Sequence, residues 1–199
     1  MNHGLAVTHA PAALIACLRA SAERARLWRP ISLSKGRSID WHGADATRLI
    51  IVERGLVKLS YLSSSGEERI KSFIADQGLF SGVDEVAEHP FEAICLEPSS
   101  IVSLPMPWVR SATQEDPAIE RAVGEFWSWL SARKRARENA LLCLSASQRY
   151  LAFQAEAPTL LGRLSQGDVA RYLGITPIAF SRIKRRLRSP SLDPAPVEG

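Results

Sequence analysis

The sequence predicts an α+β protein in three parts. These are a leading helix with an antiparallel β region (residues 1–112), a long linking helix (113–143) and a helix-turn-helix domain (144–199). Short β-branched runs separated by turn residues fill the first part. The second part carries an apolar stripe at helical spacing, and the third carries a basic segment with the pattern of two short helices.

Residues 11–26 predict an alanine-rich helix, and from about Pro30 to Pro107 the pattern is that of an antiparallel sheet or barrel. Leu49 to Val52 predicts a buried strand followed by a turn at Gly55, and the turn "SSSG" then joins two further strands as a hairpin. A second pair of strands, "FEAICL" and "SIVSLP", is separated by Glu97-Pro98-Ser99 and closes the β region.

The linking helix begins at Pro117, with Asp116 as its cap, and extends to about Leu142. An apolar seam at spacings of four, three and four residues runs along it, formed by Ile119, Val123, Phe126 and Leu130. We predict that this seam is a dimer interface, because a long helix between two domains has little other surface to cover. Packing of the seam on the chain's own barrel is the alternative.

The segment "LSQGDVARYLGITPIAFSRIKRRLR" (164–188) matches a helix-turn-helix position by position. Ser165 caps the first helix, Ala170 is the small residue at the helix crossing, and Gly174 ends that helix. Thr176-Pro177 begins the second helix. The residues expected to lock the pair are Val169, Leu173, Ile175, Phe180 and Ile183. An ordinary helical hairpin is the alternative; a membrane helix is excluded because glycine and proline interrupt it.

The positive charge of the chain is concentrated in this last part. The formal net charge is +4, yet residues 1–161 hold 18 basic and 18 acidic residues. Residues 162–199 hold seven basic and three acidic residues. A basic module beside a neutral body favours a polyanionic partner, with a merely solvated tail as the alternative.

Cysteine usage and hydropathy exclude several classes of protein. Cys17, Cys95 and Cys143 form no C-x-x-C pair, so we predict no metal site and no cofactor. The apolar stretch from Leu14 to Leu18 is too short to span a bilayer, and no Lys or Arg precedes it as in a signal peptide. We therefore expect a cytoplasmic protein with no membrane partner.

An effector-type β-roll, a linking helix and this helix-turn-helix together resemble the Crp/Fnr family, the transcription regulators related to the cyclic-AMP receptor protein. The resemblance covers about residues 30–188 and includes "ERGLVKL", "SSSGEER", "ADQGLF" and "SQRYLAF". It implies a cyclic-nucleotide-binding-like β-roll and a homodimer whose recognition helices enter successive major grooves of double-stranded DNA. A small-molecule effector and a contact with RNA polymerase are further implications.

The sequence departs from the family where the ligand is expected. Members that bind cyclic AMP hold its phosphate with an Arg-Ser or Arg-Thr pair, which "LFSGVDEVAEHPFEAICL" lacks. Pro90, Phe91 and Glu92 occupy that region, and we expect the carboxylate of Glu92 to repel a phosphate. The cysteine cluster of oxygen-sensing members is also absent, and His89 alone does not predict haem. We expect no binding of cyclic AMP.

A second departure lies in the recognition helix, where Pro177-Ile178 stands in place of the Arg-Glu that many members carry. Arg182 matches the family's base-contacting arginine, whose fork fits guanine O6 and N7. We therefore expect a non-standard operator. The predicted DNA-contacting residues are Ser165, Gln166, Thr176, Pro177, Ile178, Ser181, Arg182, Lys184, Arg185, Arg186 and Arg188. The segment "SPSLDPAPVEG" that follows is predicted to be disordered.

The sequence thus predicts a sequence-specific, DNA-binding transcription regulator that acts as a dimer through a recognition helix at Pro177–Arg188. Ser32-Leu33-Ser34-Lys35 matches the S-x-x-K pattern of some hydrolases. No partner motif accompanies it, so the sequence gives little support for catalysis. We predict no enzymatic activity. The alternative function is an effector-binding sensory module, or a protein-interaction protein, without DNA-binding activity.

Overall fold

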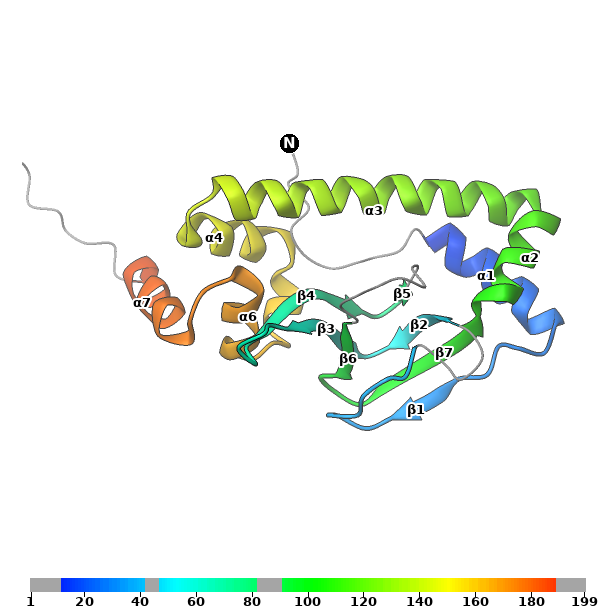
Figure 1. Cartoon of the computed structure of the whole chain (residues 1–199), viewed down its shortest axis with the longest axis horizontal. Coiled ribbons are helices and arrows are strands. Elements are labelled where there is room, and N and C mark those ends of the chain that lie inside the picture. Colours follow the sequence, from blue (N-terminus) through cyan, green and yellow to red (C-terminus); the bar gives the residue numbers. More distant parts are fainter. Residues whose placement is uncertain (1–11, 42–46, 82–90, 189–199) are drawn as a thin grey trace, which may run out of the picture.

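The computed structural model describes residues 12–41, 47–81 and 91–188. Two β-sheets lie beneath one long helix, and a group of short helices packs at one end (Figure 1). The elements are α1 (Ala12–Arg24), β1 (Ile31–Leu33), β2 (Arg48–Arg54), β3 (Leu56–Leu62), β4 (Glu68–Ala75), β5 (Gly78–Ser81), β6 (Glu92–Cys95), β7 (Ser99–Pro105), α2 (Met106–Glu115), α3 (Pro117–Cys143), α4 (Ala146–Glu156), α5 (Pro158–Leu161), α6 (Gln166–Leu173) and α7 (Pro177–Arg188). The predicted α+β class is confirmed.

The strands form a four-stranded sheet in the order β1-β7-β2-β5 and a three-stranded sheet in the order β4-β3-β6. The hairpin predicted around "SSSG" is confirmed, because β3 and β4 pair antiparallel from Leu56 and Ala75 to Leu62 and Glu68. The sequence suggested that β6 and β7 pair with each other. Both strands form, but they do not pair with each other. Instead β6 pairs with β3 and β7 pairs with β1 and β2, so the chain changes sheet between them.

Strand β2 is covered on both faces, which explains its uninterrupted apolar run. Ile50 and Val52 point into the space between the sheets, where they join a core with Val57 and Ile101. Leu49 and Ile51 point the other way, into a second core with residues of α1, α2 and α3. A strand buried on both faces cannot show the alternation of polar and apolar residues that a half-exposed strand shows.

The chain crosses from β2 to β3 at Gly55, whose φ of +119° suits glycine. An added Cβ would lie 2.2 Å from Ser99 Oγ and 2.7 Å from its Cα, so a side chain here meets backbone. Gly66 also has a positive φ, +78°, but an added Cβ there would meet no atom within 4 Å. A substitution at Gly66 would therefore introduce conformational strain alone, whereas a substitution at Gly55 would introduce both strain and a steric clash.

We predict that Gly55→Ala lowers the free energy of unfolding by about 3 kcal/mol or more, because strain and overpacking add. Gly66→Ala, the matched control, should cost only about 1 kcal/mol, the cost of strain alone. Urea denaturation of the two variants checks this. Equal losses would show that the contact with Ser99 does not constrain the crossing.

The helices after α3 pack directly on the three-stranded sheet. Phe73 of β4 lies 5.2 Å from the ring of Tyr172 in α6, and Phe153 of α4 contacts the same tyrosine at 5.1 Å. These residues belong to one core shared by β3, β4 and the C-terminal helices. Within the described ranges no helix is long and apolar enough to cross a membrane.

Polar contacts also join the β region to the segment that precedes α6. Arg163, before α6, donates to Asp76 Oδ2 at 2.6 Å and to the carbonyl oxygen of Gly55 at 2.9 Å. It also donates to both carboxylate oxygens of Glu97. This arginine therefore joins the segment before α6 to three connections between the sheets, those from β2 to β3, from β4 to β5 and from β6 to β7.

The structure adds a helix that the sequence did not indicate. Helix α2 (Met106–Glu115) spans the boundary expected at residues 112 and 113, and Asp116 separates it from α3 by accepting a hydrogen bond from the N–H of Ala118 at 2.8 Å. Helix α3 begins at Pro117, as predicted, and ends at Cys143. The three-part division stays a prediction.

Candidate nucleic-acid interface

The helix-turn-helix has the caps that its sequence predicted. Ser165 Oγ accepts a hydrogen bond from the N–H of Asp168 at 3.0 Å and so caps α6. Gly174 ends that helix in the left-handed conformation, with a φ of +71°. Thr176 Oγ1 accepts from the N–H of Ala179 at 3.2 Å at the start of α7. These predictions are confirmed.

The predicted apolar lock of the helix pair is also confirmed. Ala170 is fully buried, so its small side chain allows the helices to approach closely. The ring of Phe180 packs edge-on against Tyr150 of α4 at 5.0 Å. The buried members of the lock are Val169, Leu173, Phe180 and Ile183, and Ile175 is partly buried against them.

The face of α7 opposite this lock is exposed. Phe180 and Ile183 point inward, and the outward stripe at helical spacing consists of Ile178, Ser181, Arg182 and Arg185. Ile178 is 68% exposed, which is unusual for a large apolar side chain. Lys184 is half-buried, with Nζ 5.7 Å from the ring centre of Phe180, while Arg186 and Arg188 are exposed. The helix carries no acidic residue.

Two of the seven basic residues in the range 162–199 contact acidic residues of the chain itself. Arg163 binds Asp76 and Glu97 at the domain contact, and Arg171 of α6 lies 3.6 Å from Glu68 and 3.7 Å from Asp168. The five remaining cations therefore all belong to α7. Ser165 and Gln166 are exposed at the start of α6, where the hydroxyl of Ser165 serves as the helix cap. DNA contact by the predicted residues stays a prediction.

The apolar seam of α3 is largely buried within the chain. Ile119 is fully buried and Phe126 is 8% exposed, in a core shared with α1 and the four-stranded sheet. Val123 and Leu130 are partly buried against the same core. For Ile119 and Phe126 the structure therefore agrees with the alternative left open by the sequence, because a second copy could reach them only by opening this core.

The opposite face of α3 is exposed and has a regular spacing. Its residues follow one another at intervals of four, three, four, three and four: Gly124, Ser128, Ser131, Arg135, Glu138 and Leu142. Residues on one face of a helix recur at this spacing, which is also the spacing at which a helix can contact a second helix. Leu142 is 78% exposed, and an added Cβ at Gly124 would meet nothing within 4 Å. The sequence did not indicate this face as an interface, because its residues do not form a continuous apolar stripe.

Aromatic residues contribute to the core between the two sheets. Phe91 is buried and stacks on Trp41 with ring centres 4.3 Å apart, and the indole N–H of Trp41 donates to the carbonyl oxygen of Phe91 at 3.1 Å. Glu92, the next residue, is exposed. The expected repulsion of a phosphate by Glu92 is therefore not supported by its position, whereas Phe91 does occupy the interior. Pro90 and His89 lie outside the described residues.

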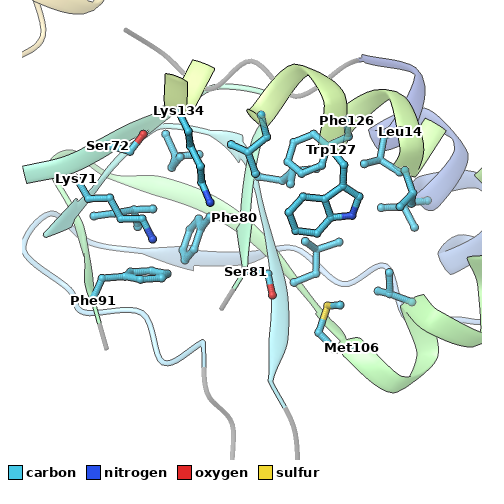
Figure 2. A pocket seen from close by; sticks show the side chains of 18 residues that line it. Leu14, Lys71, Ser72, Phe80, Ser81, Phe91, Met106, Phe126, Trp127 and Lys134 are labelled. Atoms are coloured by element: carbon cyan, nitrogen blue, oxygen red, sulfur yellow. The ribbon is translucent and has the colours of Figure 1, made fainter. Parts of the chain in front are cut away.

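A cavity of about 170 Å³ remains between the strands and α3 (Figure 2). Lys71 of β4 and Lys134 of α3 project into it, and Phe80, Phe91 and Trp127 are among its walls. The lining is otherwise mainly aliphatic. Pockets that hold drug-sized ligands occupy roughly 300–1,000 Å³, so this cavity suits a smaller molecule.

We predict no tight binding of cyclic AMP, because the cavity is small and Phe91 occupies the interior. The sugar and purine also need polar partners that a mainly apolar lining does not supply. Titration calorimetry of the full chain with cyclic AMP measures this directly. Micromolar affinity accompanied by a change in DNA binding would contradict the prediction.

The chain is similar in sequence to bacterial regulators, although no family model matches it. It is 26% identical over 159 residues to the anaerobic regulatory protein of Aggregatibacter actinomycetemcomitans, covering 73% of this chain and 62% of that protein. It is 27% identical over 173 residues to the transcriptional activator protein Anr of Pseudomonas protegens, covering 80% of this chain and 70% of Anr. The chain spans about three-fifths of the length of the anaerobic regulatory proteins that it matches.

Solved structures share its fold. FixK2 from Bradyrhizobium japonicum aligns with a TM-score of 0.66 at 22% identity, over 81% of this chain and 84% of FixK2. A cyclic nucleotide-binding domain containing protein from Listeria monocytogenes aligns with a TM-score of 0.67 at 13% identity, over 87% and 88% of the two chains. The anaerobic regulatory proteins, Anr and FixK2 are Crp/Fnr regulators, so the resemblance predicted from the sequence is confirmed.

Proposed function

We propose that this protein is a homodimeric, sequence-specific DNA-binding transcription regulator of the Crp/Fnr type. The observation that carries the proposal is the outer face of α7. It presents Arg182 and Arg185 on a helix that is capped, locked by an apolar core and free of acidic residues. Such a helix fits the major groove of DNA, where arginine recognises guanine and the backbone attracts further cations.

The similar proteins support the same conclusion. Their names describe regulatory and activator proteins, and these regulators are not enzymes. By analogy, we expect a contact with RNA polymerase and control by a small molecule. These expectations come from the relatives, since the chain spans only part of their length.

The exposed side chain of Ile178 suggests what replaces the family's usual base contact. It lies in the first turn of α7, one helical turn before Arg182, and is 68% exposed. An apolar side chain in the major groove contacts the 5-methyl group of thymine. We therefore expect a thymine in each half-site, next to a guanine contacted by Arg182.

Dimerisation is proposed through the exposed face of α3 that runs from Gly124 to Leu142. The small residues Gly124, Ser128 and Ser131 allow a second helix to approach closely, and Arg135 and Glu138 offer charges of opposite sign for pairing between helices. A two-fold axis along this helix would place one α7 on each side, as a symmetric operator requires.

Binding to labelled duplex DNA at two salt concentrations tests the function. We expect full-length protein to bind a random-sequence duplex at 50 mM salt and to lose affinity steeply at 200 mM salt, because phosphate contacts release counterions. The alternative, a sensory module without DNA-binding activity, predicts no binding at either concentration. Lys35→Ala, at an exposed residue far along the chain from α7, serves as the control and should bind like wild type.

A further inference from the structure

The cavity between the strands and α3 is charged at one end and apolar at the other. Figure 2 shows Lys71 and Lys134 extending toward Phe80 and Phe91, whereas Trp127 lies toward the opposite end. The lysines come from different elements, β4 and α3, and are far apart in the sequence. Their convergence is thus a property of the folded chain.

The two lysines lack a described acidic partner. No ion pair joins either of them to another residue of the described ranges. The ammonium group of Lys71 lies 4.0 Å from the ring centre of Phe91 and 5.4 Å from that of Tyr61. Burial, and then the nearby charge of Lys134, lower the pKa of Lys71 to about 8. An anion at this end would offset both effects, because its negative charge stabilises the charged form of each lysine.

The size and polarity of the cavity restrict the anion further. A volume of about 170 Å³ is close to that of the dry cavities which accept one benzene ring. Apart from the lysines, the polar side chains among the described lining residues are Ser72, Ser81 and the indole of Trp127, and the hydroxyl of Ser81 already donates to the carbonyl oxygen of Arg48. A doubly charged phosphate would lack donors here, whereas one carboxylate matches two ammonium groups.

We propose that this cavity binds a small apolar monocarboxylate, about one ring in size, with its carboxylate between Lys71 and Lys134 and its hydrocarbon part directed toward Trp127. The role of this ligand as an effector rests on the proposed function. A ligand held there would join β4 to α3, the helix that leads into the helix-turn-helix domain. It would therefore favour one placement of that domain over others.

Calorimetry with benzoate and with benzamide, its neutral analogue of similar shape, tests the proposal on the full chain. We expect benzoate to bind at least tenfold more tightly than benzamide. Lys71→Met and Lys134→Met should each weaken benzoate binding at least tenfold. Lys35→Met is the matched control, because it removes the same charge at an exposed position, and its affinity should equal that of wild type.

A second measurement needs no variant of the lysines. In wild-type protein, nuclear Overhauser contacts should join the benzoate ring protons to an indole ring, and Trp127→Phe should remove them. Equal affinity for benzoate and benzamide, unchanged affinity in both lysine variants, or no binding of benzoate at millimolar concentration would overturn the proposal. DNA binding by the same preparation is measured separately, so loss of the ligand proposal leaves the proposed function standing, and the reverse also holds.

Discussion

Arg182→Ala is expected to abolish discrimination at one base pair of each half-site. The side chain is exposed in the second turn of α7, beside Ser181 and one helical turn after Ile178. A bidentate contact between arginine and guanine contributes about 1–3 kcal/mol of discrimination against the wrong base. Competition between an operator and its single-base variants measures the loss, which should appear at one position and leave binding to random DNA nearly unchanged.

Arg186→Ala is the matched variant on the same helix. Arg186 is exposed but lies beside the central stripe, where we expect the helix to meet the phosphate backbone. Its removal should weaken specific and non-specific binding together and lower the salt slope by about one per subunit. If Arg182→Ala also weakens operator and random DNA equally, the assignment of Arg182 as a base-contacting residue is wrong.

Gly124→Glu combined with Ser131→Glu is expected to convert the dimer into a monomer. Both positions are exposed, and an added Cβ at Gly124 has open space, so the fold of one chain tolerates the change. In the proposed dimer the same carboxylates would face one another across the helix pair, where like charges repel. Light scattering should give a mass near 21.9 kDa for the variant and twice that for wild type.

The control for this variant is Arg110→Glu, which makes the same change in charge on the exposed side of α2. It should remain dimeric. The Val123 and Leu130 positions are poor sites for such a test, because both pack against the buried core and a glutamate there would destabilise the single chain. A monomeric wild type, or an unchanged mass in the double variant, would contradict dimerisation through this face.

The helix-turn-helix could be predicted in detail because its signals are local. The caps at Ser165 and Thr176, the left-handed Gly174 and the buried Ala170 each follow from a residue and its close neighbours in sequence. The hairpin of β3 and β4 was equally local, since one short turn joins its strands.

Features that depend on distant residues could not be predicted in this way. The pairing of β6 with β3, and of β7 with β1 and β2, depends on how two sheets stack, which no local pattern encodes. The periodicity of α3 showed that Ile119 and Phe126 lie on one face but not that the chain's own core covers them. The convergence of Lys71 and Lys134 is likewise visible only after folding.

Selection of duplex DNA from a random pool by the purified full-length protein tests the central claim most directly. The account predicts recovery of a two-fold symmetric site with half-sites about one helical turn, roughly 34 Å, apart. Each half-site should contain a guanine whose preference disappears with Arg182→Ala. Recovery of no common sequence, or of an asymmetric one that Arg182→Ala selects equally well, would contradict the claim that a dimer reads DNA with α7.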